Sequence, residues 1–220
     1  MLVKVSRGFT LIELLIVILL INILLTLFIP ILDKVKQKTY TVQCTYTLKG
    51  LGTACYAYAL NYAGMLPHED NGSGGMEPFN SCWYDVLPAY INGDRNSKNS
   101  MKFCQESYLG YDDLYNSETK ICYSYKMNSR LEDFRGSPQF RRISSVKNPS
   151  STVLFFDGRL DKKYYQYRAY GIFKAVFQRH YGKANILFMD GHVDTLFNEN
   201  SVNNYWLDDN GLMWDPEKKR

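Results

Sequence analysis

Four side chains near the C-terminal end of the sequence could bind a metal ion or exchange protons. They are His180, Asp190, His192 and Asp194, and imidazole and carboxylate groups suit a divalent transition metal. We favour a structural role, in which His180 braces a hairpin by bonding Asp190 or the backbone. Gly191 would supply the positive φ that the Asp-Gly turn requires. We therefore expect no resident metal or other cofactor.

No recognisable catalytic motif accompanies these residues. The sequence contains no HExxH, GxSxG, Walker or GxGxxG word. The acidic pairs at 112–113 and 208–209 could hold calcium, but their spacing is not that of an EF-hand loop. The sequence therefore predicts that the protein is not an enzyme.

A segment at residues 162–168 alternates basic and aromatic side chains, as proteins that bind single-stranded nucleic acid do. A strand with tyrosines on one face explains the segment equally well. The net charge of +4 is too small to argue for a nucleic-acid partner. We do not expect one.

The N-terminal stretch is strongly apolar. As a helix, residues 9–32 would span about 36 Å, enough to cross the hydrocarbon core of a membrane. A secretory signal peptide would be shorter and would end in a small-residue cleavage site, which is missing after Leu32. Glu13 is the one charged residue in this stretch. A carboxylate in lipid is costly unless a partner neutralises it.

Residues 33–64 continue the same helix outside the membrane. Gly50 and Gly52 weaken it by about 1 kcal/mol each relative to alanine, and Ala63-Gly64 with Pro67 beyond should end it. An apolar stripe at helical spacing should dock on a globular domain; it comprises Cys44, Leu48, Leu51, Cys55, Tyr58 and Tyr62.

The remainder, residues 65–220, is predicted to be a β-rich domain. Its runs of β-branched and aromatic residues are separated by turn formers, which favours an antiparallel sheet. Asp157-Gly158 and Asp190-Gly191 each follow an apolar run and are typical of hairpin turns. The expected strands are 121–127, 152–156, 164–173, 184–189 and 192–197. The fold class is α+β, with a long N-terminal helix packed on a C-terminal antiparallel sheet.

The word Arg7-Gly8-Phe9-Thr10-Leu11-Ile12-Glu13 resembles the processing site of type IV prepilins and type II secretion pseudopilins. The resemblance implies that residues 1–8 are a leader, which a prepilin peptidase removes after Gly8 before methylating Phe9. It also implies that Glu13 pairs with the N-terminal amine of a neighbouring subunit. The leader would lie in the cytoplasm and the bulk of the chain outside the inner membrane.

The C-terminal part has a second resemblance. His180, followed by nine residues and then Asp190-Gly191, is similar to the signature of the prepilin-type processing-associated domain with a His-x9-Asp-Gly motif. That family is pilin-like and implies no catalytic activity. The resemblance thus supports a pilin-like fold.

An extracytoplasmic domain should contain at least one disulfide. Cys44 and Cys55 cannot bridge each other in an intact helix, because eleven residues separate them by about 16 Å. The candidates are Cys82, Cys104 and Cys122, with Cys104–Cys122 preferred and Cys82–Cys104 second.

These observations predict a structural subunit of a type IV pilus-like or type II secretion pseudopilus filament. Its partners would be the prepilin peptidase/N-methyltransferase, other pilin subunits and an inner-membrane assembly platform. The alternative is a membrane-anchored minor pilin that acts as a binding module for DNA or a surface ligand.

Overall fold

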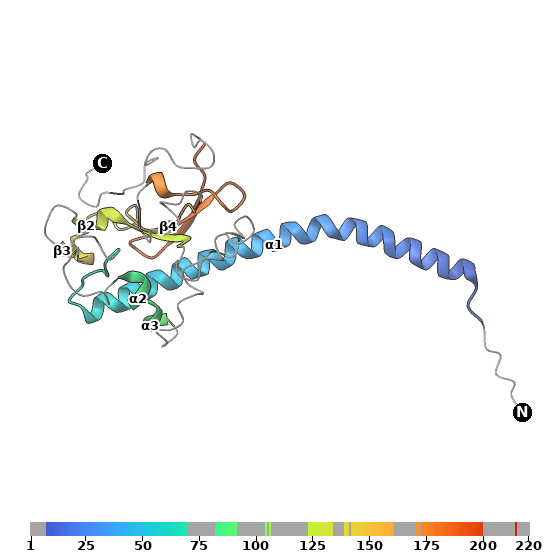
Figure 1. The fold of residues 1–220 in the computed structure, drawn as a ribbon, viewed down its shortest axis with the longest axis horizontal. Helices are drawn as coiled ribbons and strands as arrows, with labels where there is room; N and C mark the ends of the chain where they lie inside the picture. The colour runs from blue at the N-terminus through green and yellow to red at the C-terminus, as the bar shows by residue number, and fades with distance from the viewer. Residues whose placement is uncertain are drawn as a thin grey trace, which may run out of the picture. The chain divides into compact units, whose positions relative to one another are not determined.

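The chain divides into two compact units, residues 1–39 and residues 40–220. Helix α1 (Leu11–Asn61) begins in the first unit and ends in the second (Figure 1). The computed structural model describes residues 8–69, 82–91, 104, 106, 123–133, 139–140, 142–160, 170–171, 173–199 and 214.

The first unit is an apolar helix with its side chains exposed. The aliphatic residues between Leu11 and Leu32 are at least two-fifths exposed, and the helix continues through Pro30. Among the described residues, α1 is the one helix long and apolar enough to cross a membrane.

The second half of α1 carries the predicted buried stripe. Cys44, Leu48, Leu51, Cys55 and Tyr58 are all at most 5% exposed. Tyr62, which was expected to continue this stripe, is instead 47% exposed and stacks on Tyr58 with ring centroids 4.2 Å apart.

After Asn61 the backbone leaves the helix through two left-handed residues. Ala63 has φ 53° and Gly64 has φ 80°. The carbonyl oxygen of Ala59 accepts both the Tyr62 N–H at 3.1 Å and the Gly64 N–H at 2.8 Å, which closes the end of the helix.

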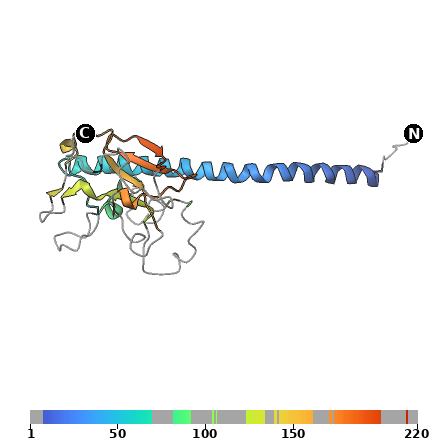
Figure 2. The ribbon, with the colours of Figure 1, turned by 90° about the horizontal axis from the view of Figure 1, so that it is seen from above.

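A five-stranded sheet forms the body of the second unit. Its order is β5-β1-β4-β6-β7, and all pairs are antiparallel except β1 with β5. Figures 1 and 2 show the C-terminal part of α1 running beside these strands. The strands are β1 (Tyr125–Asn128), β4 (Val153–Asp157), β5 (Tyr170–Gly171), β6 (Ala184–Phe188) and β7 (Val193–Leu196).

The central strands β4 and β6 are buried at every residue, and all their residues are apolar except Asp157 and Asn185. On one face, Phe155 and Leu187 pack with the stripe of α1. A Cβ atom at Gly52 would lie 3.0 Å from Leu187 Cδ2, so this glycine lets α1 approach β6 closely. On the other face, Phe156 and Ile186 pack with Trp214.

Short elements connect these parts. Strands β2 and β3 pair with each other in a separate antiparallel ribbon. The short elements are α2 (Trp83–Val86), α3 (Pro88–Ile91), η3 (Ser129–Leu131), β2 (Glu132–Asp133), β3 (Gln139–Phe140), η4 (Ile143–Ser145) and η5 (Phe173–Ala175).

Three predicted strands, at 152–156, 184–189 and 192–197, are confirmed to within one or two residues as β4, β6 and β7. The strand expected at 121–127 begins only at Tyr125, with 121–122 outside the described residues. Of the run at 164–173, residues 164–169 lie outside them. The described strand there is the two-residue β5, parallel to β1, and η5 begins at Phe173.

The two Asp-Gly words have different structures. Asp190-Gly191 forms the expected turn between β6 and β7, and Gly191 has φ 91°. Asp157-Gly158 is not a hairpin turn, so that prediction is wrong. Asp157 is the last residue of β4. Gly158 follows it and forms an isolated antiparallel bridge with Val176. The dipeptide is the same, but Gly158 lacks the positive φ of a hairpin turn. Side-chain carbons of Lys126 lie where a Cβ atom on residue 158 would be.

Replacing Gly191 tests the turn. Nothing lies within 4 Å of the position of an added Cβ, so Gly191→Ala introduces backbone strain without a clash. We expect it to lower the stability of the full chain in detergent by about 1–2 kcal/mol, measured by thermal unfolding. Gly191→Asn should lose less, because asparagine tolerates left-handed conformations. Equal melting temperatures for Gly191→Ala and the wild type would contradict this account.

Candidate functional site

The first functional candidate is the start of α1. The Thr10 N–H and the Thr10 hydroxyl both donate to Glu13 Oε2 at 2.8 Å, and the Glu13 N–H donates to Thr10 Oγ1 at 3.3 Å. This reciprocal arrangement is a capping box, which satisfies backbone donors at a helix N-terminus. Sequence reasoning missed Thr10, although Thr-x-x-Glu before an apolar run is the signal for such a cap.

Both predicted processing residues precede this cap. Gly8 and Phe9 lie outside the helix, and Phe9 is 73% exposed. The peptide bond between them therefore lies in an exposed segment outside the helix. Glu13 uses only Oε2 in the cap, so Oε1 has no partner among the described residues.

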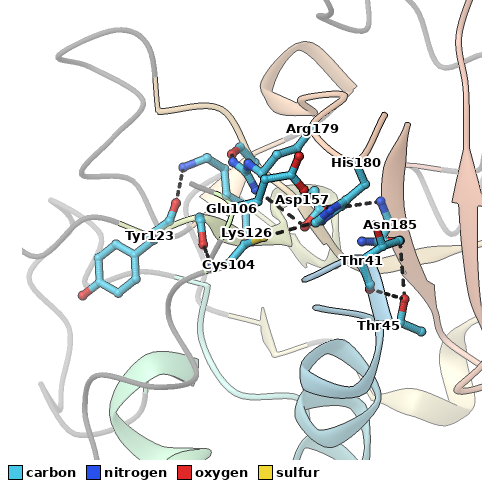
Figure 3. A network of polar contacts seen from close by, with 12 residues as sticks. Thr41, Thr45, Cys104, Glu106, Tyr123, Lys126, Asp157, Arg179, His180 and Asn185 are labelled. Carbon is cyan, nitrogen blue, oxygen red and sulfur yellow. Dashed lines mark hydrogen bonds and ion pairs between the residues drawn. The ribbon is translucent and has the colours of Figure 1, made fainter. Parts of the chain in front are cut away.

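The second candidate is a group of charged and sulfur-bearing side chains inside residues 40–220, which we call the buried cluster. Its residues come from α1, from the end of β4 and from the segment just before β6. Two more come from positions 104 and 106, which lie between α1 and β4 in the sequence (Figure 3). Its members are Cys44, Cys104, Glu106, Asp157, Arg179 and His180.

Asp157 lies at the centre of the buried cluster with a fully buried side chain. Its Oδ2 accepts the backbone N–H of Asn185 at 2.8 Å and lies 3.2 Å from His180 Nε2. Its Oδ1 lies 3.7 Å from Arg179 NH1. Arg179 also donates through NH2 to the carbonyl oxygen of Gly158 at 2.6 Å. The buried carboxylate is thus compensated by the contacts of Oδ2 and by the positive charge of Arg179 near Oδ1.

His180 is 1% exposed and contacts acidic groups through both ring nitrogens. Nδ1 lies 2.5 Å from Glu106 Oε2. Nε2 faces Asp157 and also lies 3.5 Å from Cys104 Sγ. The Sγ atoms of Cys44 and Cys104 and a ring nitrogen of His180 all lie within 4.8 Å of one another.

These contacts change the acidity of the cluster. Burial alone would raise the pKa of the Cys104 thiol, but hydrogen bonds from Cys44 and His180 and the charge of Arg179 outweigh it and lower the pKa to about 5. Burial alone would lower the pKa of His180, but Asp157, Cys104 and Glu106 raise it to about 11. The hydrogen bond to Cys104, followed by burial, raises the pKa of Cys44. These shifts favour a thiolate at Cys104 and a charged imidazolium at His180.

A thiolate beside an imidazolium is the pair that cysteine hydrolases use as nucleophile and base. Such a nucleophile must be reached by its substrate. Cys104 is 0% exposed and His180 is 1% exposed, so the pair is enclosed by protein. The geometry instead suits a structural role or the binding of an ion.

The predicted clasp between His180 and Asp190 is wrong in its partner. His180 pairs with Asp157 and Glu106, while Asp190 Oδ1 lies 2.5 Å from Nδ1 of His192. Tyr181 and Gly182 have positive φ and return the chain tightly at Lys183. The five residues of β6, about 16 Å long, then carry Asp190 to the opposite end of the strand.

The structure records no disulfide among the four cysteines that it describes, Cys44, Cys55, Cys82 and Cys104. Cys122 lies outside the described residues, so the Cys104–Cys122 pairing stays a prediction. The acidic pairs 112–113 and 208–209 and the basic segment 162–168 also lie outside them.

Comparison with known proteins finds one similarity. The family model of the prokaryotic N-terminal methylation motif matches residues 3–29, which include Gly8, Phe9 and Glu13. No curated protein and no solved structure matches the chain. The match supports a type IV pilin- or pseudopilin-like subunit that a prepilin peptidase processes, anchored in a membrane by its N-terminal helix.

Replacing His180 tests the buried cluster. His180→Ala leaves the carboxylates of Asp157 and Glu106 without their shared partner, so we expect a loss of about 3–5 kcal/mol. The measurement is thermal unfolding of the full chain in detergent with a chelator present. His192→Ala is the matched control, because its pair with Asp190 is partly exposed, and it should cost about 1 kcal/mol or less. Similar losses in the two variants would contradict this interpretation.

Proposed function

We propose that this chain is a structural subunit of a type IV pilus-like or type II secretion pseudopilus filament. A prepilin peptidase cleaves it between Gly8 and Phe9 and methylates the new amine. The subunit is then drawn from the inner membrane and stacks through α1 with other pilin subunits on an assembly platform. Residues 40–220 face the extracytoplasmic side.

The observation that carries this proposal is the methylation-motif match over the start of an exposed apolar helix. Apart from Glu13, Asn22 and Thr26, the side chains from Leu11 to Leu32 are apolar and uncovered, so they need lipid or other helices around them. Lipid surrounds these side chains while the subunit is in the membrane, and the helices of other subunits surround them in the filament core.

Glu13 has a specific part in this assembly. In the isolated chain the cap of Thr10 satisfies only one of its carboxylate oxygens. A carboxylate at this depth is costly, and so is a buried amine. The methylated amine of Phe9 from an adjacent subunit can neutralise the free oxygen, and each group thereby favours the stacking of subunits.

Processing predicts a defined mature N-terminus. Intact-mass and N-terminal peptide analysis of the chain from its native membrane should find N-methyl-phenylalanine at residue 9. Gly8→Leu should leave the leader attached, because the resemblance implies a peptidase that prefers glycine before the cleaved bond. Unprocessed Met1 in the wild-type chain would refute the proposal.

Charge and capping at Glu13 can be separated by substitution. Glu13→Gln keeps a side chain that can complete the capping box but removes the charge. We expect it to leave the melting temperature of the full chain unchanged and to reduce the subunit recovered in sheared filaments at least tenfold, because about 1.4 kcal/mol of lost pairing already corresponds to that factor.

The matched control is Thr10→Ala. It removes the cap hydroxyl and retains the charge of Glu13, so incorporation into filaments should persist. Normal incorporation of Glu13→Gln, or equal losses in both variants, would exclude charge pairing as the role of Glu13.

A further inference from the structure

We propose that the buried cluster is a zinc site. Its ligands are the Sγ atoms of Cys44 and Cys104 and the Nε2 atom of His180, and Glu106 contacts the other nitrogen of the imidazole. This inference does not depend on the proposed filament function.

The ligand set matches the preference of zinc. Structural zinc sites are tetrahedral and use thiolate and imidazole ligands, with carboxylate oxygen also accepted. Cys44, Cys104 and His180 come from distant parts of the chain, yet their ligand atoms lie within 4.8 Å of one another. All three side chains are at most 1% exposed.

The separations agree with tetrahedral coordination. Sulfur at about 2.3 Å and nitrogen at about 2.0–2.1 Å from zinc lie about 3.6 Å apart, and Cys104 Sγ lies 3.5 Å from His180 Nε2.

The surroundings also fit a metal-bound histidine. A ligating imidazole commonly donates its other N–H to a carboxylate, which fixes the tautomer and the ring orientation. The carboxylate nearest to Nδ1 is that of Glu106, with Oε2 in ion-pair contact at 2.5 Å. Two thiolates balance the charge of Zn²⁺, and Arg179 lies 3.7 Å from the neighbouring carboxylate of Asp157.

A zinc ion here would tie three separate segments together. Cys44 is on α1, His180 precedes β6, and Cys104 lies between α3 and β1. Binding free energy at such a site is also folding free energy, because the unfolded chain does not hold these ligands together.

The test uses the full wild-type chain, purified in detergent with a thiol reductant and loaded with Zn²⁺. After removal of unbound metal, elemental analysis should find about one zinc ion per chain, and a strong chelator should lower the melting temperature. Replacement by Co²⁺ should produce the thiolate-to-cobalt charge-transfer absorption of a tetrahedral site. These readouts require no variant, so a misfolded mutant cannot obscure them.

Variants then locate the site. Cys104→Ser should abolish the charge-transfer absorption or reduce it to that of a single thiolate, and Glu106→Ala should weaken zinc affinity about 10–100-fold. Cys55→Ser is the matched control, because Cys55 is a buried thiol on the same helix outside the buried cluster; it should retain zinc fully.

Three results would overturn the proposal. One is a wild-type chain that retains no zinc. Another is a chain whose zinc is lost equally in Cys55→Ser and Cys104→Ser. The third is peptide mapping of natively isolated protein that finds Cys104 in a disulfide with Cys44 or Cys122, since a disulfide sulfur is not available as a thiolate ligand.

Discussion

The buried carboxylate of Asp157 is the constraint on which the second unit depends. It ends the fully buried strand β4, where water cannot solvate it. A charge in that position needs compensating partners. Oδ2 accepts the Asn185 N–H and faces His180, and Oδ1 has the charge of Arg179 at 3.7 Å. Because Arg179, His180 and Asn185 must all lie beside Asp157, the segment that leads into β6 has to pass next to the end of β4. This positions β6 against β4.

Helix α1 meets two different environments along one uninterrupted element. Its first half presents apolar side chains in all directions, which is the pattern of a helix surrounded by lipid or by other helices. Its second half is buried along a single stripe, and Gly52 allows close contact with Leu187 of β6. The loss of helix propensity at this glycine is offset by the packing that it permits.

The two candidate sites lie in different units and use charge in different ways. At the start of α1, Glu13 is half satisfied by a local cap and exposed for a second interaction. In the buried cluster, the charges of Asp157 and His180 are enclosed and compensated within the protein. The first arrangement suits association between subunits, and the second suits stability of the unit that the helix carries.

Features that depend on neighbouring residues could be predicted from the sequence by itself. The apolar helix, its buried stripe, strands β4, β6 and β7 and the turn at Gly191 follow from periodicity and turn chemistry. The repeated Asp-Gly word did not reveal that Asp157 is a buried ion-pair partner, because the same dipeptide serves as a turn or as a strand end according to its long-range contacts. The meeting of Cys44, Cys104 and His180 was likewise decided by tertiary structure alone. Their separation in the chain leaves no local signal, and only the packing of α1 on the sheet brings their ligand atoms together.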